Sequence, residues 1–122
     1  MKKIIALALL LMPVVSLADY VDVIRGKLVP GCSMKTYLAI VQDFNEQWGK
    51  DYGYKVEILT PVQSEDVTSF FWVGRIASGA AFGKGLDAWH SGIADPNSTA
   101  GKLMTRLAAC TTNVSRSGYF TR

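Results

Sequence analysis

His90 is the only histidine among the 122 residues of the chain, and it directly follows Trp89. An imidazole titrates near neutral pH and can act as a general base or a haem ligand, so His90 is the first candidate for chemistry. Trp89 lies three residues after Leu86 and seven after Phe82, a spacing that puts it on the apolar stripe of a helix. We therefore predict that Trp89 forms part of a packed wall. His90 falls on the flank of the stripe, either as a packed margin or as the lip of a cavity.

Arg75 interrupts an otherwise apolar segment, residues 70–76. A guanidinium that leaves water needs a partner, so it is expected to pair with Asp22 or Glu57 across a sheet or to hold an anionic ligand in a cavity. Trp72 in the same segment is typical of core or dimer packing, and a ligand platform is the alternative. The candidate ligand-binding residues are Trp72, Arg75, Trp89 and His90.

Other chemistry finds little support in the residue pattern. No two carboxylates stand at a helical spacing that would complete a metal site with His90. Gly79, Gly83 and Gly85 precede a helix, but their spacing is not that of a dinucleotide fingerprint, and no lysine-serine pair of a phosphate loop follows. We predict no metal and no cofactor, and no known catalytic motif assigns a catalytic residue.

Residues 1–18 have the features of a secretory signal peptide. Two lysines precede an apolar stretch, and Ser16-Leu17-Ala18 supplies small residues, Ser16 and Ala18, for cleavage. The apolar stretch is short for a bilayer span and contains Pro13, which argues against a retained membrane anchor. We expect a mature chain that begins at Asp19, spans no membrane and resides in the bacterial periplasm or outside the cell.

Charge and length limit the mature chain further. Removal of 18 residues leaves 104, enough for one domain with a substantial core. Loss of Lys2 and Lys3 lowers the net charge from +3 to about +1, and no basic cluster remains. Binding to nucleic acid depends on such clusters, so we predict that the protein binds none.

Hydrophobic periodicity predicts the order β-α-β-β-α-β for a single domain over residues 19–122. Alternating or continuous apolar patterns mark the strands, and spacings of three and four mark the helices. Ser33 is expected to cap the first helix, and Asp95-Pro96 to break the second and restart it as cap and first helical position. The predicted strands are 20–29, 54–59, 70–76 and 111–121, with one helix from 34 to before 53 and the other between 81 and 108.

This order matches the ferredoxin-like α+β fold, in which four antiparallel strands carry the helices on one face. The third strand is apolar on both sides, because Phe71 and Val73 alternate with Phe70, Trp72 and Ile76. The sheet face without helices would therefore expose large side chains. A second copy of the same sheet is the simplest cover, so we predict a homodimer.

The stretch F-F-W-V-G-R, followed by A-A-F-G-x-G-x-D-A-W, together with this element order, resembles the dimeric α+β barrel superfamily. That superfamily includes NIPSNAP-like proteins and small antibiotic-biosynthesis-type monooxygenases. The resemblance spans residues 20–120 and implies a dimer with a cavity between sheet and helices. Members include cofactor-independent oxygenases, haem-handling enzymes, isomerases and proteins without known activity, so the resemblance assigns no specific reaction.

Cys32 and Cys110 are the only cysteines. In the predicted fold, Cys32 follows the first strand and Cys110 precedes the fourth, and these strands are antiparallel neighbours. Two cysteines at adjacent strand ends in an exported chain favour a structural disulfide.

Two functions follow as hypotheses. The first is an exported, non-catalytic protein that binds a small apolar or amphipathic ligand, or a partner, through an apolar cavity and its dimer surface. The second is a cofactor-independent oxygenase or isomerase that uses His90, with Arg75 holding an anionic substrate. The direction of the His90 side chain, toward the sheet and Arg75 or toward solvent, separates the two.

Overall fold

The computed structural model describes residues 19–122, so the predicted signal peptide lies outside the described residues. No helix in residues 19–122 is both long enough and apolar enough to cross a membrane. The order of strands and helices is the predicted one, with a 3-10 helix added after the first helix. The elements are β1 (Tyr20–Leu28), α1 (Met34–Gln47), η1 (Gly49–Tyr52), β2 (Lys55–Leu59), β3 (Phe70–Ile76), α2 (Gly79–Ile93), α3 (Thr99–Cys110) and β4 (Thr111–Phe120).

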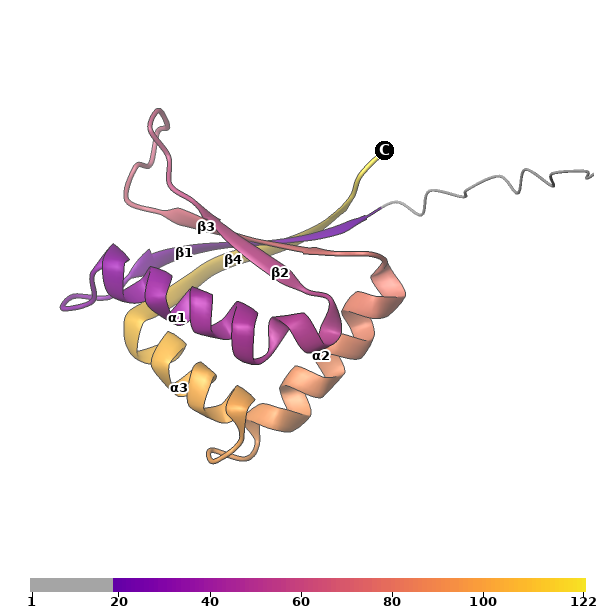
Figure 1. Cartoon of the computed structure of the whole chain (residues 1–122). Helices are drawn as coiled ribbons and strands as arrows, with labels where there is room; N and C mark the ends of the chain where they lie inside the picture. The colour runs from indigo at the N-terminus through magenta and orange to yellow at the C-terminus, as the bar shows by residue number, and fades with distance from the viewer. Residues whose placement is uncertain (1–18) are drawn as a thin grey trace, which may run out of the picture.

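The four strands form one antiparallel sheet in the order β2-β3-β1-β4. All three α-helices lie on the same face of this sheet, and the opposite face carries none (Figure 1). The ferredoxin-like α+β prediction is therefore confirmed. We call the two sides of the sheet the helix face and the open face.

Alternation along β3 separates the two faces. Phe70, Trp72 and Ile76 lie on the helix face and are buried in the core. Phe71 and Val73 lie on the open face, as the alternation predicts. Other apolar side chains share the open face, among them Leu59 on β2 and Tyr119 on β4, which are 50% and 55% exposed.

The break between α2 and α3 lies where the sequence predicts it, but the residue that caps α3 differs from the predicted one. Asp95 does not cap α3; its carboxylate accepts from the backbone N–H of Asn97 at 2.9 Å and forms a turn. The cap is Ser98, whose hydroxyl oxygen accepts from the N–H of Gly101 at 2.9 Å. The backbone of Asp95 packs so closely on Gly101 that a Cβ there would overlap it. The turn thus uses three more residues before the helix begins.

Cys32 and Cys110 form the predicted disulfide, with their Cα atoms 5.2 Å apart. Cys110 ends α3 directly before β4, and Cys32 lies between β1 and α1. The bond closes a loop with a sequence separation of 78. In the chain-entropy description, such a loop contributes about 4 to 5 kcal/mol of stability.

Candidate functional site: a cavity between the sheet and the helices

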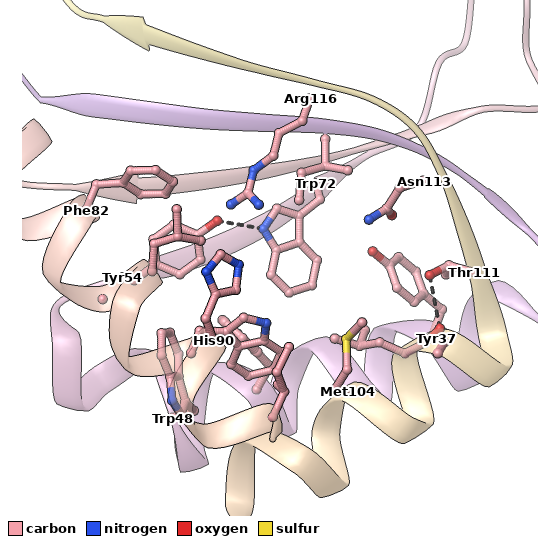
Figure 2. A pocket seen from close by; sticks show the side chains of 18 of the residues that line it. Tyr37, Trp48, Tyr54, Trp72, Phe82, His90, Met104, Thr111, Asn113 and Arg116 are labelled. Atoms are coloured by element: carbon pink, nitrogen blue, oxygen red, sulfur yellow. Dashed lines mark hydrogen bonds between the residues drawn. The ribbon is translucent and has the colours of Figure 1, made fainter. Parts of the chain in front are cut away.

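A cavity of about 420 Å³ lies between the helix face of the sheet and the helices. Most of its lining is aromatic or aliphatic, and the ionisable side chains in that lining are two tyrosines, one histidine and one arginine. Among residues 19–122, no aspartate or glutamate lines it. Figure 2 shows Arg116 and Asn113 reaching into the cavity from β4, opposite the residues that α2 contributes. The aromatic lining comprises Tyr37, Phe44, Trp48, Tyr54, Phe70, Trp72, Phe82 and Trp89.

Asp22 on β1 is the buried centre of a hydrogen-bond network beside this cavity. Its side chain is 1% exposed. The Tyr54 hydroxyl donates to Oδ2 at 2.7 Å, and Arg116 donates through Nε and Nη2 at 2.8 Å each. The indole Nε1 of Trp72 in turn donates to the Tyr54 oxygen at 2.8 Å. These four side chains, which we call the Asp22 network, give the buried carboxylate the partners that it needs.

Gly74 makes room for this network. It stands opposite Asp22 in the pairing of β1 with β3. A Cβ on Gly74 would overlap the phenol ring and hydroxyl of Tyr54, so the ring lies directly against the strand backbone. The glycine that interrupts the apolar run in the sequence therefore positions Tyr54 between Asp22 and Trp72.

The Tyr54 phenol and the Arg116 guanidinium both stay protonated in the Asp22 network. Burial raises the pKa of the Tyr54 phenol far above its usual value, and the nearby charge of Asp22 raises it further. The phenol therefore stays protonated, with its hydrogen committed to Asp22. Hydrogen bonds to Asp22 raise the pKa of Arg116, which remains a cation. Tyr54 is fixed on both sides and acts as part of the cavity lining.

Arg116 belongs to the network but is also open to the cavity. Its side chain is 46% exposed, and its guanidinium carbon lies 5.6 Å from the ring centre of Phe82. A guanidinium has five N–H donors, and the two bonds to Asp22 use two of them. Figure 2 shows the guanidinium group directed from β4 into the cavity, on the side of Tyr54 and His90.

A bulge in the pairing of β1 with β4 brings Asn113 to the same face as Arg116. The register shifts between Arg25 and Gly26, so that Ile24 pairs with Arg116 while Gly26 pairs with Asn113. Residues three apart on a regular strand point to opposite faces. The extra residue on β4 cancels this alternation, and both polar side chains line the cavity.

His90 lies at the rim of the cavity. The residue is exposed, yet it lines the cavity, and its imidazole points toward the sheet and the guanidinium of Arg116 (Figure 2). Of the two alternatives in the sequence, the cavity lip is the one that the structure has. Within residues 19–122 no group of three or more histidine, cysteine or acidic side chains is arranged to hold a metal ion.

Solved structures with a similar arrangement of sheet and helices are known. The chain is similar to SnoaB, a cofactor-independent oxygenase from Streptomyces nogalater, with a TM-score of 0.57 and 14% identity over 86% of this chain and 94% of that one. It is also similar to a hydroxynitrile lyase from Passiflora edulis, with a TM-score of 0.58 and 13% identity over 87% and 95% of the two chains. These likenesses show that the chain shares the fold of the two proteins.

A dimeric protein of unknown function from Bacteroides fragilis, with a ferredoxin-like fold, aligns with a TM-score of 0.46 and 13% identity over 84% of this chain and 96% of that one. No protein family matches the sequence, and no curated protein matches it significantly. Identities this low show a shared fold alone. The resemblance to the dimeric α+β barrel superfamily therefore extends to the fold, and assignment to its NIPSNAP-like or monooxygenase-like families stays a prediction.

Three of the four candidate residues line the cavity. Trp72 is 7% exposed, and its indole joins the Asp22 network. Trp89 packs edge to face against Phe44 and Trp48, with ring centres 5.4 and 5.0 Å apart. Trp72 is therefore a core residue, Trp89 is a partly buried residue packed against the core, and both border the cavity, with His90 at the rim.

Arg75 is the candidate that the structure puts elsewhere. It pairs with Val21 in the register of β1 and lies on the open face, outside the lining of the cavity. Its Nε lies 3.4 Å from Oε1 of Glu57, and both side chains are more than half exposed. Of the two partners considered for Arg75, Glu57 is present, while Asp22 pairs with Arg116.

Sequence reasoning missed Arg116, Asn113 and Tyr54 as cavity residues. One signal was available for Arg116: Asp22 alternates with Tyr20 and Ile24 on a face that must be buried, so it needs a cation there. The sequence alone offers many arginines and lysines for that role. Asn113 has no such signal, because its orientation depends on the bulge.

Proposed function

We propose that the protein binds a small apolar or amphipathic molecule in the cavity and that its primary role is binding. The observation that carries this proposal is the aromatic cavity of about 420 Å³ between the sheet and the helices. Its size and its mostly apolar lining with a few convergent polar groups are typical of small-molecule sites. The hydroxyl of Tyr54 is committed to Asp22 and Trp72, which favours a structural role for it.

The binding test uses N-phenyl-1-naphthylamine, a neutral apolar fluorophore. Its fluorescence should rise saturably, with one molecule bound per chain. Ala108→Phe places a ring in the cavity lining and should weaken binding at least about tenfold, which is about 1.4 kcal/mol. Ala109→Phe is the matched control, since Ala109 is exposed and lies outside the lining. Equal binding by both variants and the unmodified protein would contradict the proposal.

A second candidate function is a cofactor-independent oxygenase or isomerase that uses His90 as general base. The direction of the imidazole into the cavity favours it. A catalytic base is usually oriented by a third group. Within residues 19–122, neither a hydrogen bond nor an ion pair holds the His90 ring, which argues against this function. The two similar structures named as an oxygenase and a hydroxynitrile lyase share the fold, and their chemistry is a guide to assays only.

The assay for this second function measures turnover and binding in parallel. Oxygen consumption with a panel of phenols and cleavage of mandelonitrile would be followed for the unmodified protein and for His90→Gln. Turnover that disappears in His90→Gln, while N-phenyl-1-naphthylamine still binds, would establish the enzyme. Absence of turnover in the unmodified protein would contradict the use of His90 in these two reactions.

We further propose that two copies pair through the open face. Phe71, Leu59 and Tyr119 form an apolar surface on the sheet side that carries no helix, and Val73 lies buried among the strands on the same side. Phe71→Glu should convert a sedimenting dimer to monomers, because a charge buried in an interface without a partner is costly. Leu38→Glu, an equally drastic change at an exposed site on α1, should leave the dimer intact. A protein that sediments as a monomer without any substitution would contradict the pairing.

Export is the third part of the proposal. The disulfide Cys32–Cys110 is compatible with an oxidising compartment such as the periplasm. Expression of the full chain in a bacterium should yield a protein whose first residue is Asp19. Recovery of a chain that starts at Met1 from the cytoplasm would contradict export.

A further inference from the structure

We propose that the cavity binds monocarboxylates with an apolar body, and that Arg116 binds the carboxylate. This inference rests on the proposed binding function and names its ligand class. It starts from the unequal distribution of charge: within residues 19–122, the cavity lining contains the cation Arg116 but no acidic residue. An anionic head group would therefore meet no repulsion from the lining.

The acidic residue that lies nearest, Asp22, is not available to a ligand. It is 1% exposed and already accepts three hydrogen bonds, one from Tyr54 and two from Arg116. It instead positions the guanidinium, whose Nε and Nη2 it holds at 2.8 Å. An arginine held in this way loses little side-chain entropy when it binds a second group.

The remaining donors of Arg116 match a carboxylate. The Asp22 contacts occupy one edge of the guanidinium and leave Nη1 with both of its N–H groups. The guanidinium is directed into the cavity (Figure 2). The Phe82 ring lies beside it, and the His90 imidazole at the rim points toward it. A carboxylate oxygen accepts charge-assisted hydrogen bonds from such donors.

Polarity in the cavity is arranged along one direction. The polar side chains on β4, Thr111, Asn113 and Arg116, lie at the sheet side, with Phe82 beside Arg116, and the ring of Trp48 on the helix side lies across the cavity from them (Figure 2). A ligand with a head and an apolar body would place its carboxylate at β4 and its body among the rings. Asp22 neutralises part of the Arg116 charge, so the preference for an anion should be moderate.

The test compares naphthalene derivatives that differ only in their head group. Displacement of N-phenyl-1-naphthylamine is measured with 2-naphthoate, methyl 2-naphthoate and 2-naphthylmethylamine, which is a cation. The carboxylate should displace the probe at a concentration about tenfold lower than the ester, and the amine should be the weakest. Arg116→Gln should abolish the difference between carboxylate and ester. Arg75→Gln is the control, because Arg75 lies on the open face.

Arg116→Gln leaves the buried Asp22 without its cation and can destabilise the protein, so two further variants keep the test decisive. The double variant Asp22→Asn/Arg116→Gln removes both charges and so leaves no unpaired carboxylate, and Arg116→Lys keeps a charge without the planar fork. Equal affinity of the unmodified protein for carboxylate and ester would overturn the inference while leaving the binding function in place. A carboxylate preference that survives in the double variant would overturn the role of Arg116. Failure of the probe and of all three naphthalenes to bind would instead overturn the proposed function.

Discussion

Asp22 and Arg116 are 94 positions apart in the chain, yet two parallel hydrogen bonds of 2.8 Å join them across the pair of strands β1 and β4. The carboxylate is buried and the guanidinium is half exposed, so the pair connects the core to the lining of the cavity. This connection has consequences for stability that can be measured independently of any ligand.

Asp22→Asn should destabilise the protein by about 3 kcal/mol, because it removes the charge that Arg116 and Tyr54 are arranged around. Thermal unfolding of the two proteins measures the difference. Glu57→Gln removes the partner of Arg75, in an ion pair more than half exposed, and should change stability by less than about 1 kcal/mol. Equal effects of the two substitutions would show that the Asp22 network contributes no more than a surface pair.

Gly74→Ala should cost about 1 to 3 kcal/mol, because the added Cβ overlaps the Tyr54 ring, which must move away from Asp22 and Trp72. Gly83→Ala is the matched control. Nothing lies within 4 Å of a Cβ at Gly83, which is inside α2, so alanine there should stabilise by about 0.5 to 1 kcal/mol. Denaturant unfolding would contradict the packing argument if Gly74→Ala were neutral.

The buried phenols of Tyr37 and Tyr54 predict a loss of stability at alkaline pH. Burial raises the pKa of both phenols above the usual value of about 10. Above that pH the unfolded chain releases these protons, whereas the folded chain retains them. Their contribution to stability is therefore complete below about pH 10 and falls as the pH rises further.

Denaturant unfolding between about pH 9 and about pH 11 measures this fall. Tyr37→Phe removes one of the two phenols, so the slope above pH 10 should become shallower by up to about 1.4 kcal/mol per pH unit. An unchanged slope in Tyr37→Phe would mean that this phenol ionises as easily in the folded protein as in the unfolded chain.

Trp89→Ala should destabilise by about 3 to 5 kcal/mol, because the indole packs against Phe44 and Trp48 and its loss leaves a cavity. His90→Ala should leave the melting temperature nearly unchanged, since His90 is exposed at the rim. The two substitutions thus separate the packed wall from its edge. A large loss of stability in His90→Ala would show that the imidazole is a packing residue.

The sequence by itself determined the local features of this protein. Periodicity of two along residues 70–76 assigns Trp72 to one face and Arg75 to the other, and helical spacing assigns Trp89 to the core. These inferences succeed because the direction of a side chain within one element depends only on its neighbours in the chain. The disulfide follows from element order, since adjacent strand ends bring Cys32 and Cys110 together.

Only the tertiary structure decided which charged groups meet. Both Arg75 and Arg116 were available to Asp22 by chemistry, and the register of β1 against its neighbours selects Arg116. A shift of one residue in that register would turn Arg116 to the open face. The bulge beside Arg25 likewise brings Asn113 into the cavity. Register and bulges arise from the packing of distant segments, so no local pattern in the sequence contains them.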